Sequence, residues 1–221
     1  MDTIEKKMND IVIYGAGGLG REVACLLNLI NETAPKWNLV GFLDDDEKIW
    51  GSENKYGIIL GGADWINRNS KPMAVVIAVG SPAAVRAITS KINNPYVDFP
   101  NIIAPSVTFL DKESVSLGKG NVICSSCLIS CNVSMGDFNL LNGSIPIGHE
   151  AMIGSYNVIM PSTNISGGVV IGNGNFLGVK STVLQYVKIG DDVRVGAGSV
   201  VMRNTKDGNL YMGNPATKVK L

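Results

Sequence analysis

The chain contains a single histidine, His149, and a glutamate, Glu150, directly follows it. Histidine is the side chain whose ordinary pKa places a usable base near neutral pH. A carboxylate hydrogen-bonded to one imidazole nitrogen fixes the tautomer and stabilises the imidazolium, which leaves the other nitrogen as a better base. The pair therefore predicts general base chemistry, in which His149 removes a proton from an attacking nucleophile.

A second candidate site is a glycine-rich turn in which Gly15, Gly17 and Gly20 form a G-x-G-x-x-G motif. A short apolar run precedes the turn, and residues 21–31 follow it with apolar side chains at helical spacing. Glycines at such a turn let the backbone approach a phosphate, and the helix N-terminus supplies amides and a partial positive charge. The motif predicts a nucleotide pyrophosphate site, and the alternative is a tight turn without a ligand.

The elements around this turn are typical of a small parallel α/β unit. We expect strands over residues 11–14, 39–43 and 74–79, and helices that begin at Arg21 and at Pro82, the latter capped by Ser81. Asp44 ends the second strand, where an acidic residue takes a hydroxyl or a ring nitrogen, as in nicotinamide dinucleotide sites. However, the unit is about half a full dinucleotide fold, and it carries no candidate acid or base for hydride transfer.

A period of six residues runs without interruption from residue 117 to residue 205. A helix repeats its apolar face every three or four residues and a strand every two, so this period fits neither. It fits a parallel β-helix, in which three hexads form one triangular coil and fifteen hexads form five coils. The hexads begin with the aliphatic residues Leu117, Ile123, Ile129, Met135, Leu141, Ile147, Ile153, Ile159, Ile165, Ile171, Leu177, Val183, Ile189, Val195 and Val201.

The same register predicts which other positions face the interior and which lie at corners. His149 comes two places after an aliphatic residue, at a corner, where its side chain projects outward. Small residues four places after the aliphatic ones are expected to point inward: Cys127, Ala151, Thr163, Ser181 and Ser199. We attribute the glycines that directly follow aliphatic residues to the backbone freedom that a corner needs: positions 118, 136, 148, 154, 172, 178, 190 and 196.

Composition narrows the function classes. The chain has 19 basic and 19 acidic residues and no basic tract, which argues against a nucleic-acid partner. The first ten residues carry charges where a signal peptide would need an apolar core, and no apolar stretch approaches membrane-spanning length. We therefore expect a cytoplasmic protein without a membrane partner.

Three of the four cysteines, Cys124, Cys127 and Cys131, form a C-x2-C-x3-C pattern that suggests a metal site. The hexad register points Cys127 inward and puts the other two at different corner positions, so the thiols should diverge. A tetrahedral zinc site also needs a fourth ligand, and none is apparent. We expect reduced, packing cysteines and no metal.

The hexads, the glycine turn and the histidine–glutamate pair together resemble the hexapeptide-repeat acetyltransferases of the sialic acid O-acetyltransferase type. The resemblance is strongest to the bacterial UDP-4-amino-sugar N-acetyltransferases of the PglD type. It extends from Tyr14 to Ala216 and is most specific over residues 141–154 and 170–178.

This resemblance implies a Rossmann-like, nucleotide-sugar-binding α/β domain over residues 1–104 and a left-handed parallel β-helix with a C-terminal tail over residues 105–221. It also implies a homotrimer with active sites between neighbouring subunits. The implied reaction moves an acetyl group from acetyl-CoA to a sugar, most simply to the amine of a UDP-amino sugar.

The resemblance also assigns roles to individual residues. His149 would be the general base and Glu150 would raise its basicity. The backbone amide of Gly167 would meet the oxyanion, and coenzyme A would run along the coils against Val179 and Ala197. A further set would bind the acceptor: Asn142 at the acceptor group, Gly17 and Gly18 at the nucleotide phosphates, and Asp44 and Asp45 at its base.

Three positions depart from the pattern of the PglD-like members. Val158 stands where they have a second histidine that contacts the cofactor. Leu19 stands where their glycine turn carries a histidine, and Gly148 where an acid precedes the catalytic histidine. The latter two lie near the predicted sugar-nucleotide site.

Several alternatives remain open on the residues alone. One is O-acetylation of a free sugar such as a sialic acid, because His149 could activate a hydroxyl as well as an amine. A non-catalytic, nucleotide-sensing trimeric scaffold and an NAD-dependent dehydrogenase are the others. A zinc carbonic anhydrase on a similar β-helix is excluded, because one histidine cannot supply its ligands.

Overall fold

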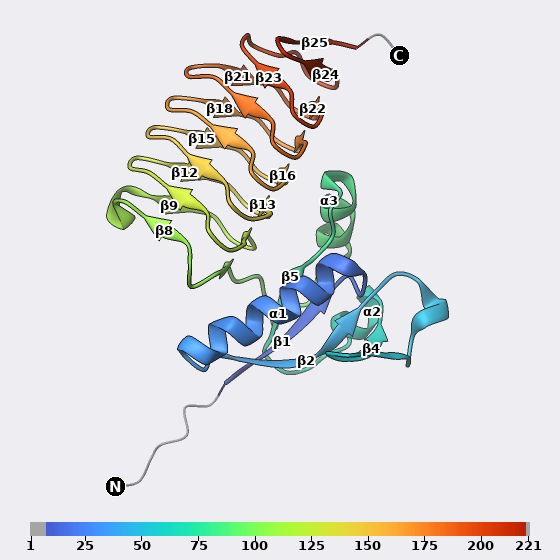
Figure 1. The fold of residues 1–221 in the computed structure, drawn as a ribbon. Helices are drawn as coiled ribbons and strands as arrows, with labels where there is room; N and C mark the ends of the chain where they lie inside the picture. Colours follow the sequence, from blue (N-terminus) through green and yellow to red (C-terminus); the bar gives the residue numbers. More distant parts are fainter. Residues whose placement is uncertain (1–7, 220–221) are drawn as a thin grey trace, which may run out of the picture.

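The computed structural model describes residues 8–219. The charged residues 1–7, on which the expectation about a signal peptide partly rests, lie outside the described residues. Between residues 8 and 219, no helix has the length and apolar character needed to cross a bilayer. The chain forms an α/β unit that lies at one end of a long β-helix (Figure 1).

The α/β unit is built on a six-stranded sheet in the order β3-β4-β2-β1-β5-β6, in which only β3 runs antiparallel to its neighbour. Helix α1 includes the end of the glycine turn and so begins earlier than predicted. The other expected elements are present close to their predicted bounds. The elements are β1 (Asn9–Tyr14), α1 (Gly18–Thr33), β2 (Trp37–Leu43), the 3-10 turn η1 (Glu47–Ile49), β3 (Glu53–Asn54), β4 (Gly57–Gly61), α2 (Ala63–Asn67), β5 (Met73–Ile77), α3 (Pro82–Lys91) and β6 (Val97–Asp98).

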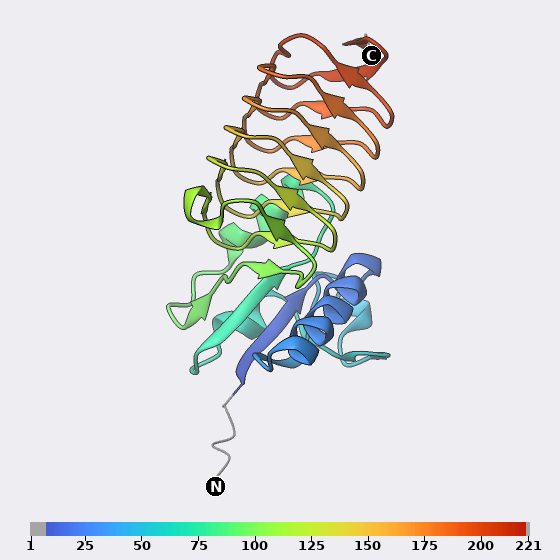
Figure 2. The same cartoon turned by 60° about the vertical axis from the view of Figure 1, so that its left-hand side comes forward.

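The β-helix stacks short strands into three parallel walls (Figure 2). The first wall contains β7 (Ile102–Ile103), β10 (Val122–Ile123), β13 (Leu140–Leu141), β16 (Val158–Ile159), β19 (Phe176–Leu177) and β22 (Arg194–Val195). The second contains β8 (Thr108–Phe109), β11 (Leu128–Ile129), β14 (Pro146–Ile147), β17 (Asn164–Ile165), β20 (Thr182–Val183) and β23 (Val200–Val201). The third contains β9 (Ser116–Leu117), β12 (Ser134–Met135), β15 (Met152–Ile153), β18 (Val170–Ile171) and β21 (Lys188–Ile189).

Strands that pair within a wall are 18 residues apart, as when Leu140 pairs with Val158, so each coil consists of three hexads. This confirms the predicted left-handed, hexapeptide-type β-helix. The β-helix begins at Ile102, before the first predicted hexad at Leu117. The first coil escaped the period because the 3-10 turn η2 (Lys112–Ser114) lengthens it, so that Ile102 pairs with Val122.

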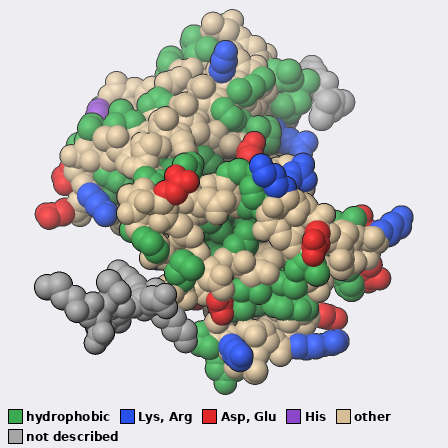
Figure 3. Space-filling view, turned by 60° about the horizontal axis from the view of Figure 1, so that its bottom comes forward, with side chains coloured by type: hydrophobic (Ala, Val, Ile, Leu, Met, Phe, Trp, Pro, Cys, Tyr) green, Lys and Arg blue, Asp and Glu red, His purple; other side chains and the backbone are tan. Residues whose placement is uncertain are grey.

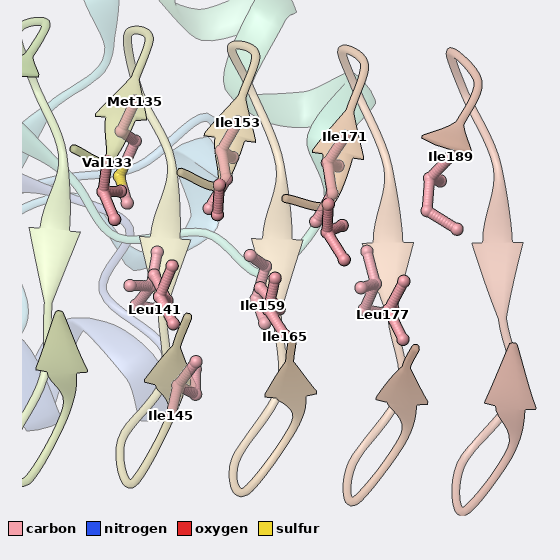
Figure 4. Close-up of a cluster of buried hydrophobic side chains, with 14 of the residues drawn as sticks. Val133, Met135, Leu141, Ile145, Ile153, Ile159, Ile165, Ile171, Leu177 and Ile189 are labelled. Atoms are coloured by element: carbon pink, nitrogen blue, oxygen red, sulfur yellow. The ribbon is translucent and has the colours of Figure 1, made fainter. Parts of the chain in front are cut away.

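The interior of the β-helix is filled by rows of stacked aliphatic side chains (Figure 4). Of the fifteen residues that begin the hexads, all but Leu117 are buried. The small residues predicted to point inward are also confirmed, since each is at most 1% exposed: Cys127, Ala151, Thr163, Ser181 and Ser199.

The glycines that follow the aliphatic residues serve close packing rather than backbone freedom, so the prediction of their role was wrong. None of them has a positive φ. A Cβ on Gly154 would lie 2.6 Å from the carbonyl oxygen of Gly172 in the next coil, so the bare Cα lets the coils approach. The left-handed backbone occurs instead three places after the aliphatic residue, as at Glu150 (φ +59°) and Tyr186 (φ +63°).

A ladder of buried asparagines runs through the coils. The hexad register did not predict that asparagines would point inward. Asn121, Asn139, Asn157 and Asn175 are at most 1% exposed. The Asn157 amide donates to Asn139 Oδ1 (2.9 Å) and to the Gly172 carbonyl (3.0 Å), while its oxygen accepts from the Asn175 backbone and side chain. The ladder therefore satisfies polar groups that are sealed from water.

Replacing Asn157 with alanine is expected to lower the free energy of unfolding by at least about 2 kcal/mol, because buried groups on both neighbouring asparagines lose their partners. Urea denaturation followed by circular dichroism measures this. Asn164→Ala is the control, because Asn164 is exposed on the second wall and its loss should cost less than about 0.5 kcal/mol. Equal losses in the two variants would show that the ladder does not stabilise the coils.

Three columns of corners join the walls. The first corner joins the first wall to the second, the second corner joins the second wall to the third, and the third corner leads back to the first wall in the next coil. In one coil the first corner covers residues 142–145, the second 148–151 and the third 154–157. The α/β unit packs on the first wall and on the third corner. Helix α1 and strand β1 share one apolar core with outward-facing residues of the first wall: Ile102, Val122, Leu140 and Val158.

Helix α3 makes the contact with the third corner. Arg86 Nη1 lies 2.8 Å from Asp192 Oδ1, and the Arg86 guanidinium lies 5.6 Å from the centroid of the Tyr156 ring. Phe138 packs between Phe99 and Tyr156. The α/β unit thus leaves the second corner, which carries His149, uncovered.

The C-terminal tail packs on the far end of the β-helix. Strand β24 (Leu210–Gly213) pairs with β22 and with β25 (Ala216–Lys218). Tyr211 and Ala216 pack against the interior of the helix, and the Gly213 N–H donates to Ser199 Oγ at 3.0 Å. The tail therefore covers the edge of β22, the last hexad strand of the first wall.

Candidate active site

His149 and Glu150 lie at the second corner, directly after strand β14. The left-handed backbone of Glu150 turns its side chain back beside the imidazole, so that Glu150 Oε2 lies 3.4 Å from His149 Nδ1. The His149 side chain is 48% exposed, and Figure 3 shows it at the molecular surface. The carboxylate engages Nδ1, which leaves Nε2 available to accept a proton.

The space beside His149 Nε2 is bounded by Gly167, which occupies the equivalent position one coil further on. A Cβ on Gly167 would lie 2.5 Å from His149 Nε2 and 2.7 Å from its Cε1, so the imidazole rests against the bare Cα. No acceptor among residues 8–219 receives the Gly167 N–H. A proton acceptor and an unpaired amide donor are thus adjacent, which is the arrangement that acyl transfer requires.

A groove of about 500 Å³ runs along the first corner, between the coils and the start of helix α3. Val179 and Ala197, which the resemblance assigns to coenzyme A, both line this groove, and their contact with coenzyme A stays a prediction. The opposite side of the groove is formed by the loop before α3, and no sequence pattern predicted it. The full lining is Gly80, Ser81, Pro82, Met160, Phe176, Gly178, Val179, Arg194, Val195, Gly196, Ala197 and Leu210.

The glycine turn between β1 and α1 is shaped by two close approaches. Gly15 has a φ of +115°, and a Cβ there would lie 2.5 Å from the Ala78 carbonyl oxygen. A Cβ on Gly20 would collide with the Gly15 carbonyl. Gly17 and Gly18 instead face open space at the N-terminus of α1, where no side chain caps the helix. The exposed amides suit an anionic ligand.

The two aspartates after β2 have partners within the chain. Asp44 Oδ2 accepts from the Ala16 N–H (2.9 Å) and thereby holds the glycine turn. Asp45 accepts from the Tyr14 hydroxyl and pairs with Lys91 Nζ at 2.7 Å. Contact of either carboxylate with a nucleotide base stays a prediction.

The Asp45 contacts also fix its charge. Burial alone would raise the pKa of Asp45, but the hydrogen bonds from Lys91 and Tyr14 outweigh it and hold that pKa below its ordinary value. Burial, and then the hydrogen bond to Asp45, raise the pKa of Tyr14 well above its ordinary value. At neutral pH, Asp45 is therefore ionised and Tyr14 remains a donor.

Family profiles match both parts of the chain. The PglD N-terminal domain matches residues 10–92, and the bacterial transferase hexapeptide (six repeats) matches residues 168–203. Among solved structures, the acetyltransferase domain of PglB from Neisseria gonorrhoeae is 26% identical, with a TM-score of 0.86 over 96% of this chain and 100% of that one. That domain has also been solved in complex with acetyl coenzyme A. The chain is a hexapeptide-repeat acyltransferase with a PglD-type N-terminal domain.

Two further structures share the fold of this acyltransferase. PerB from Caulobacter crescentus, solved with CoA and GDP-perosamine, is 24% identical over 97% of this chain and 99% of that one, with a TM-score of 0.81. WeeI from Acinetobacter baumannii is 24% identical over 96% and 100%, with a TM-score of 0.82. No curated protein sequence matches the chain significantly.

Within one subunit of the acyltransferase, the predicted site residues fall into separate groups. His149, Glu150 and Gly167 meet at the second corner. Asn142 lies at the first corner, on the same edge as the groove but on a different edge from His149. The glycine turn with its aspartates forms the third group. A single subunit therefore does not bring Asn142 to the histidine.

The structure shows the surroundings of all three departures from the PglD-like pattern. Val158 is 1% exposed and belongs to the core between α1 and the first wall, where Leu19 also packs. Gly148 has no room for a side chain, because a Cβ there would collide with the Gly167 nitrogen and lie 2.7 Å from the Ser166 carbonyl carbon. An acid before His149 is thus incompatible with this corner.

Two cysteines of the acyltransferase, Cys124 and Cys127, have the environment of packing residues, whereas Cys25 is exposed. Burial raises the pKa of Cys124 to about 12 and also raises the pKa of Cys127. Thiols with raised pKa values are poor nucleophiles and poor metal ligands. In the described part of the chain, no three His, Cys, Asp or Glu side chains gather as metal ligands would.

Proposed function

We propose that this acyltransferase moves the acetyl group of acetyl-CoA to the amine of a nucleotide-activated amino sugar, with His149 as the general base. The observation that carries the proposal is the position of His149 Nε2 against Gly167, whose amide has no acceptor within the described chain. Glu150 engages the other imidazole nitrogen. Acetyl-CoA is a cytoplasmic metabolite, so we propose that compartment for the protein.

The reaction follows from this geometry. The sugar amine attacks the thioester carbonyl carbon, and the new C–N bond pushes the carbonyl electron pair onto oxygen. The Gly167 N–H donates to this oxyanion, while His149 Nε2 takes a proton from the attacking nitrogen. The C–S bond then breaks, and the imidazolium returns the proton to the CoA thiolate. Glu150 stabilises the imidazolium while it exists.

The acceptor would bind to the α/β unit. Gly17 and Gly18 expose their amides at the positive end of α1, a helix of 16 residues, which suits the pyrophosphate of a nucleotide sugar. PerB, with the same fold, was solved with GDP-perosamine. We further propose that Asp44 and Asp45 face the base and keep their present partners as they do so.

We propose a homotrimer, because the two halves of the reaction lie on different edges of the β-helix. The groove and Asn142 lie along the first corner, and His149 lies at the second. In such a trimer, with its threefold axis parallel to the axis of the β-helix, the first corner of one subunit would lie against the second corner of its neighbour. The donor and Asn142 would then reach His149 across the subunit interface.

The groove assignment predicts the effect of filling it. Ala197 is an exposed residue of the groove, and Ala197→Trp should raise the Kd for acetyl-CoA at least about tenfold by occupying the donor's volume. Isothermal titration calorimetry measures this, with Ser116→Trp on the exposed third wall as the control. Unchanged affinity in Ala197→Trp would place the donor elsewhere.

The same variant tests the shared site. Co-expressed Ala197→Trp and His149→Ala subunits form mixed trimers, in which some interfaces pair an intact groove with an intact histidine. Such mixtures should be more active than either parent alone. A mixture no more active than its parents would contradict a site built between subunits.

The function itself is tested by the release of free thiol from acetyl-CoA. The panel comprises nucleotide sugars with an amine, the matching sugars with a hydroxyl at that carbon, and free sialic acid. Turnover should require the amine. Turnover with hydroxyl acceptors alone would favour O-acetylation, and tight nucleotide binding without turnover would favour a sensing scaffold.

A further inference from the structure

Two adjacent glycines of the second corner, Gly167 and Gly168, hold two aromatic rings from different coils. The His149 imidazole, from the coil before, lies where a Cβ of Gly167 would be. The Tyr186 ring, from the coil after, lies where a Cβ of Gly168 would be, with its Cε1 2.5 Å and its Cγ 3.6 Å from that position. Consecutive Cα atoms are about 3.8 Å apart, so the two rings rest on adjacent residues of one corner.

Backbone hydrogen bonds hold both His149 and Tyr186 beside this dipeptide. The Gly168 N–H donates to the His149 carbonyl at 2.8 Å, and the Tyr186 N–H donates to the Gly167 carbonyl at 3.1 Å. Tyr186 therefore cannot slide away from the catalytic corner without breaking the coil.

The Tyr186 ring packs on the glycine one coil before it, as Phe138 packs on Gly120, but no described residue of the α/β unit holds it. Tyr186 has a φ of +63°, which is unfavourable for a bulky residue, and it is 66% exposed. The aromatic residues at the same hexad position on the third corner, Phe138 and Tyr156, are held by Phe99 and Arg86 of the α/β unit. Tyr186 packs on Gly168 and otherwise faces outward from the coil.

The proposed acetyl transfer determines what lies beside this ring. The thioester oxygen points to the Gly167 N–H, the nucleophile enters beside His149 Nε2, and the sulfur leads to the coenzyme. The remaining substituent of the carbonyl carbon is the acyl chain. In the proposed complex this chain lies over Gly168, next to Gly167 and against the Tyr186 ring.

We infer that Tyr186 closes the acyl pocket and restricts the donor to a short acyl thioester, acetyl-CoA. This inference rests on the proposed function and adds the residue that selects the donor. A longer chain would have to displace a ring that is held against Gly168. One methylene in a confined pocket changes kcat/KM by about 10- to 200-fold, so chain length is a sensitive readout.

The test compares kcat/KM for acetyl-, propionyl- and butyryl-CoA with a saturating amino-sugar acceptor. Tyr186→Ala should lower the acetyl-to-butyryl preference at least about tenfold, mainly through a gain on butyryl-CoA. Tyr186→Phe keeps the ring and should keep the wild-type preference. Tyr96→Ala is the matched control, because Tyr96 is a 54% exposed tyrosine on the α/β unit, away from the corner.

A merely structural role would lower the rate for all donors equally and shift the melting temperature, without changing their ratio. An unchanged acetyl-to-butyryl ratio in Tyr186→Ala, with wild-type acetyl transfer intact, overturns the inference alone. Failure of the wild-type enzyme to transfer any acyl group overturns the proposed function and the inference together. If Tyr186→Ala folds poorly, Tyr186→Leu provides the same comparison with a smaller loss of volume.

Discussion

Replacing His149 with alanine is expected to lower kcat for acetyl transfer by about 10²- to 10⁴-fold, which is the usual contribution of a positioned general base. The imidazole is half-exposed and lies at a corner, so its loss should leave the fold and the melting temperature unchanged. Steady-state thiol release measures the rate, and calorimetry measures the affinities for both substrates.

Glu150→Gln provides a graded comparison, because glutamine keeps the size of the side chain but loses its charge. We expect a smaller loss of kcat than in His149→Ala, since Nε2 can still accept a proton without the neighbouring carboxylate. Wild-type turnover in His149→Ala would show that the second corner carries no base catalysis. The amine would then lose its proton to water.

Replacing Gly167 with alanine is expected to have the second largest effect, a loss of about 10²-fold in kcat. The added methyl would occupy the position 2.5 Å from His149 Nε2, so the imidazole has to swing away from the Gly167 amide. Gly167 does not have a positive φ, so alanine fits the backbone and the coil should remain intact. Thiol release and thermal denaturation, measured on the same samples, check both halves of this expectation.

The double variant separates the two possible causes. If Gly167→Ala acts by displacing the imidazole, it should change the rate little in the His149→Ala background, because the displaced group is already absent. A further loss of the same size in the double variant would show that the methyl acts on the oxyanion site independently of the histidine.

The regular part of the fold was predictable because every hexad has the same pattern of inward-facing and outward-facing positions. An aliphatic residue turns inward every six positions, and a second residue turns inward four places after it, so Ile147 and Ala151 could be placed without knowledge of their neighbours. The first coil was not predictable, because the turn at Lys112–Ser114 breaks the period. The reason for the glycines was also missed, since the contact between Gly154 and Gly172 exists only after the coils stack.

The parts of the candidate site that are close together in the sequence could be predicted, and the parts that only the fold brings together could not. His149 and Glu150 are neighbours in sequence, and the chain offers no other histidine. Gly167 followed from the resemblance, and the structure adds that its Cα supports the imidazole. Tyr186 carried no signal of its own, because its position against Gly168 depends on the stacking of three coils.

The other features that could not be predicted from the sequence depend on contacts between residues far apart in the chain. The pair between Arg86 and Asp192 joins residues 106 positions apart, and no sequence pattern relates them. Asp44 accepts a hydrogen bond from the Ala16 amide and so holds the glycine turn in place. The sequence had predicted only that Asp44 contacts the base of a nucleotide. Such contacts fix where the α/β unit sits, and hence which corner remains open for catalysis.

The most direct test of acetyl transfer to an amine is the structure of the product. The purified protein would be incubated with acetyl-CoA and a nucleotide amino sugar that it turns over, and the sugar product would be analysed by mass spectrometry and NMR. We predict a nucleotide sugar that carries one additional acetyl group on its amine nitrogen, absent when His149→Ala replaces the wild type. An acetyl ester on a hydroxyl, or an unmodified sugar beside hydrolysed acetyl-CoA, would contradict this account.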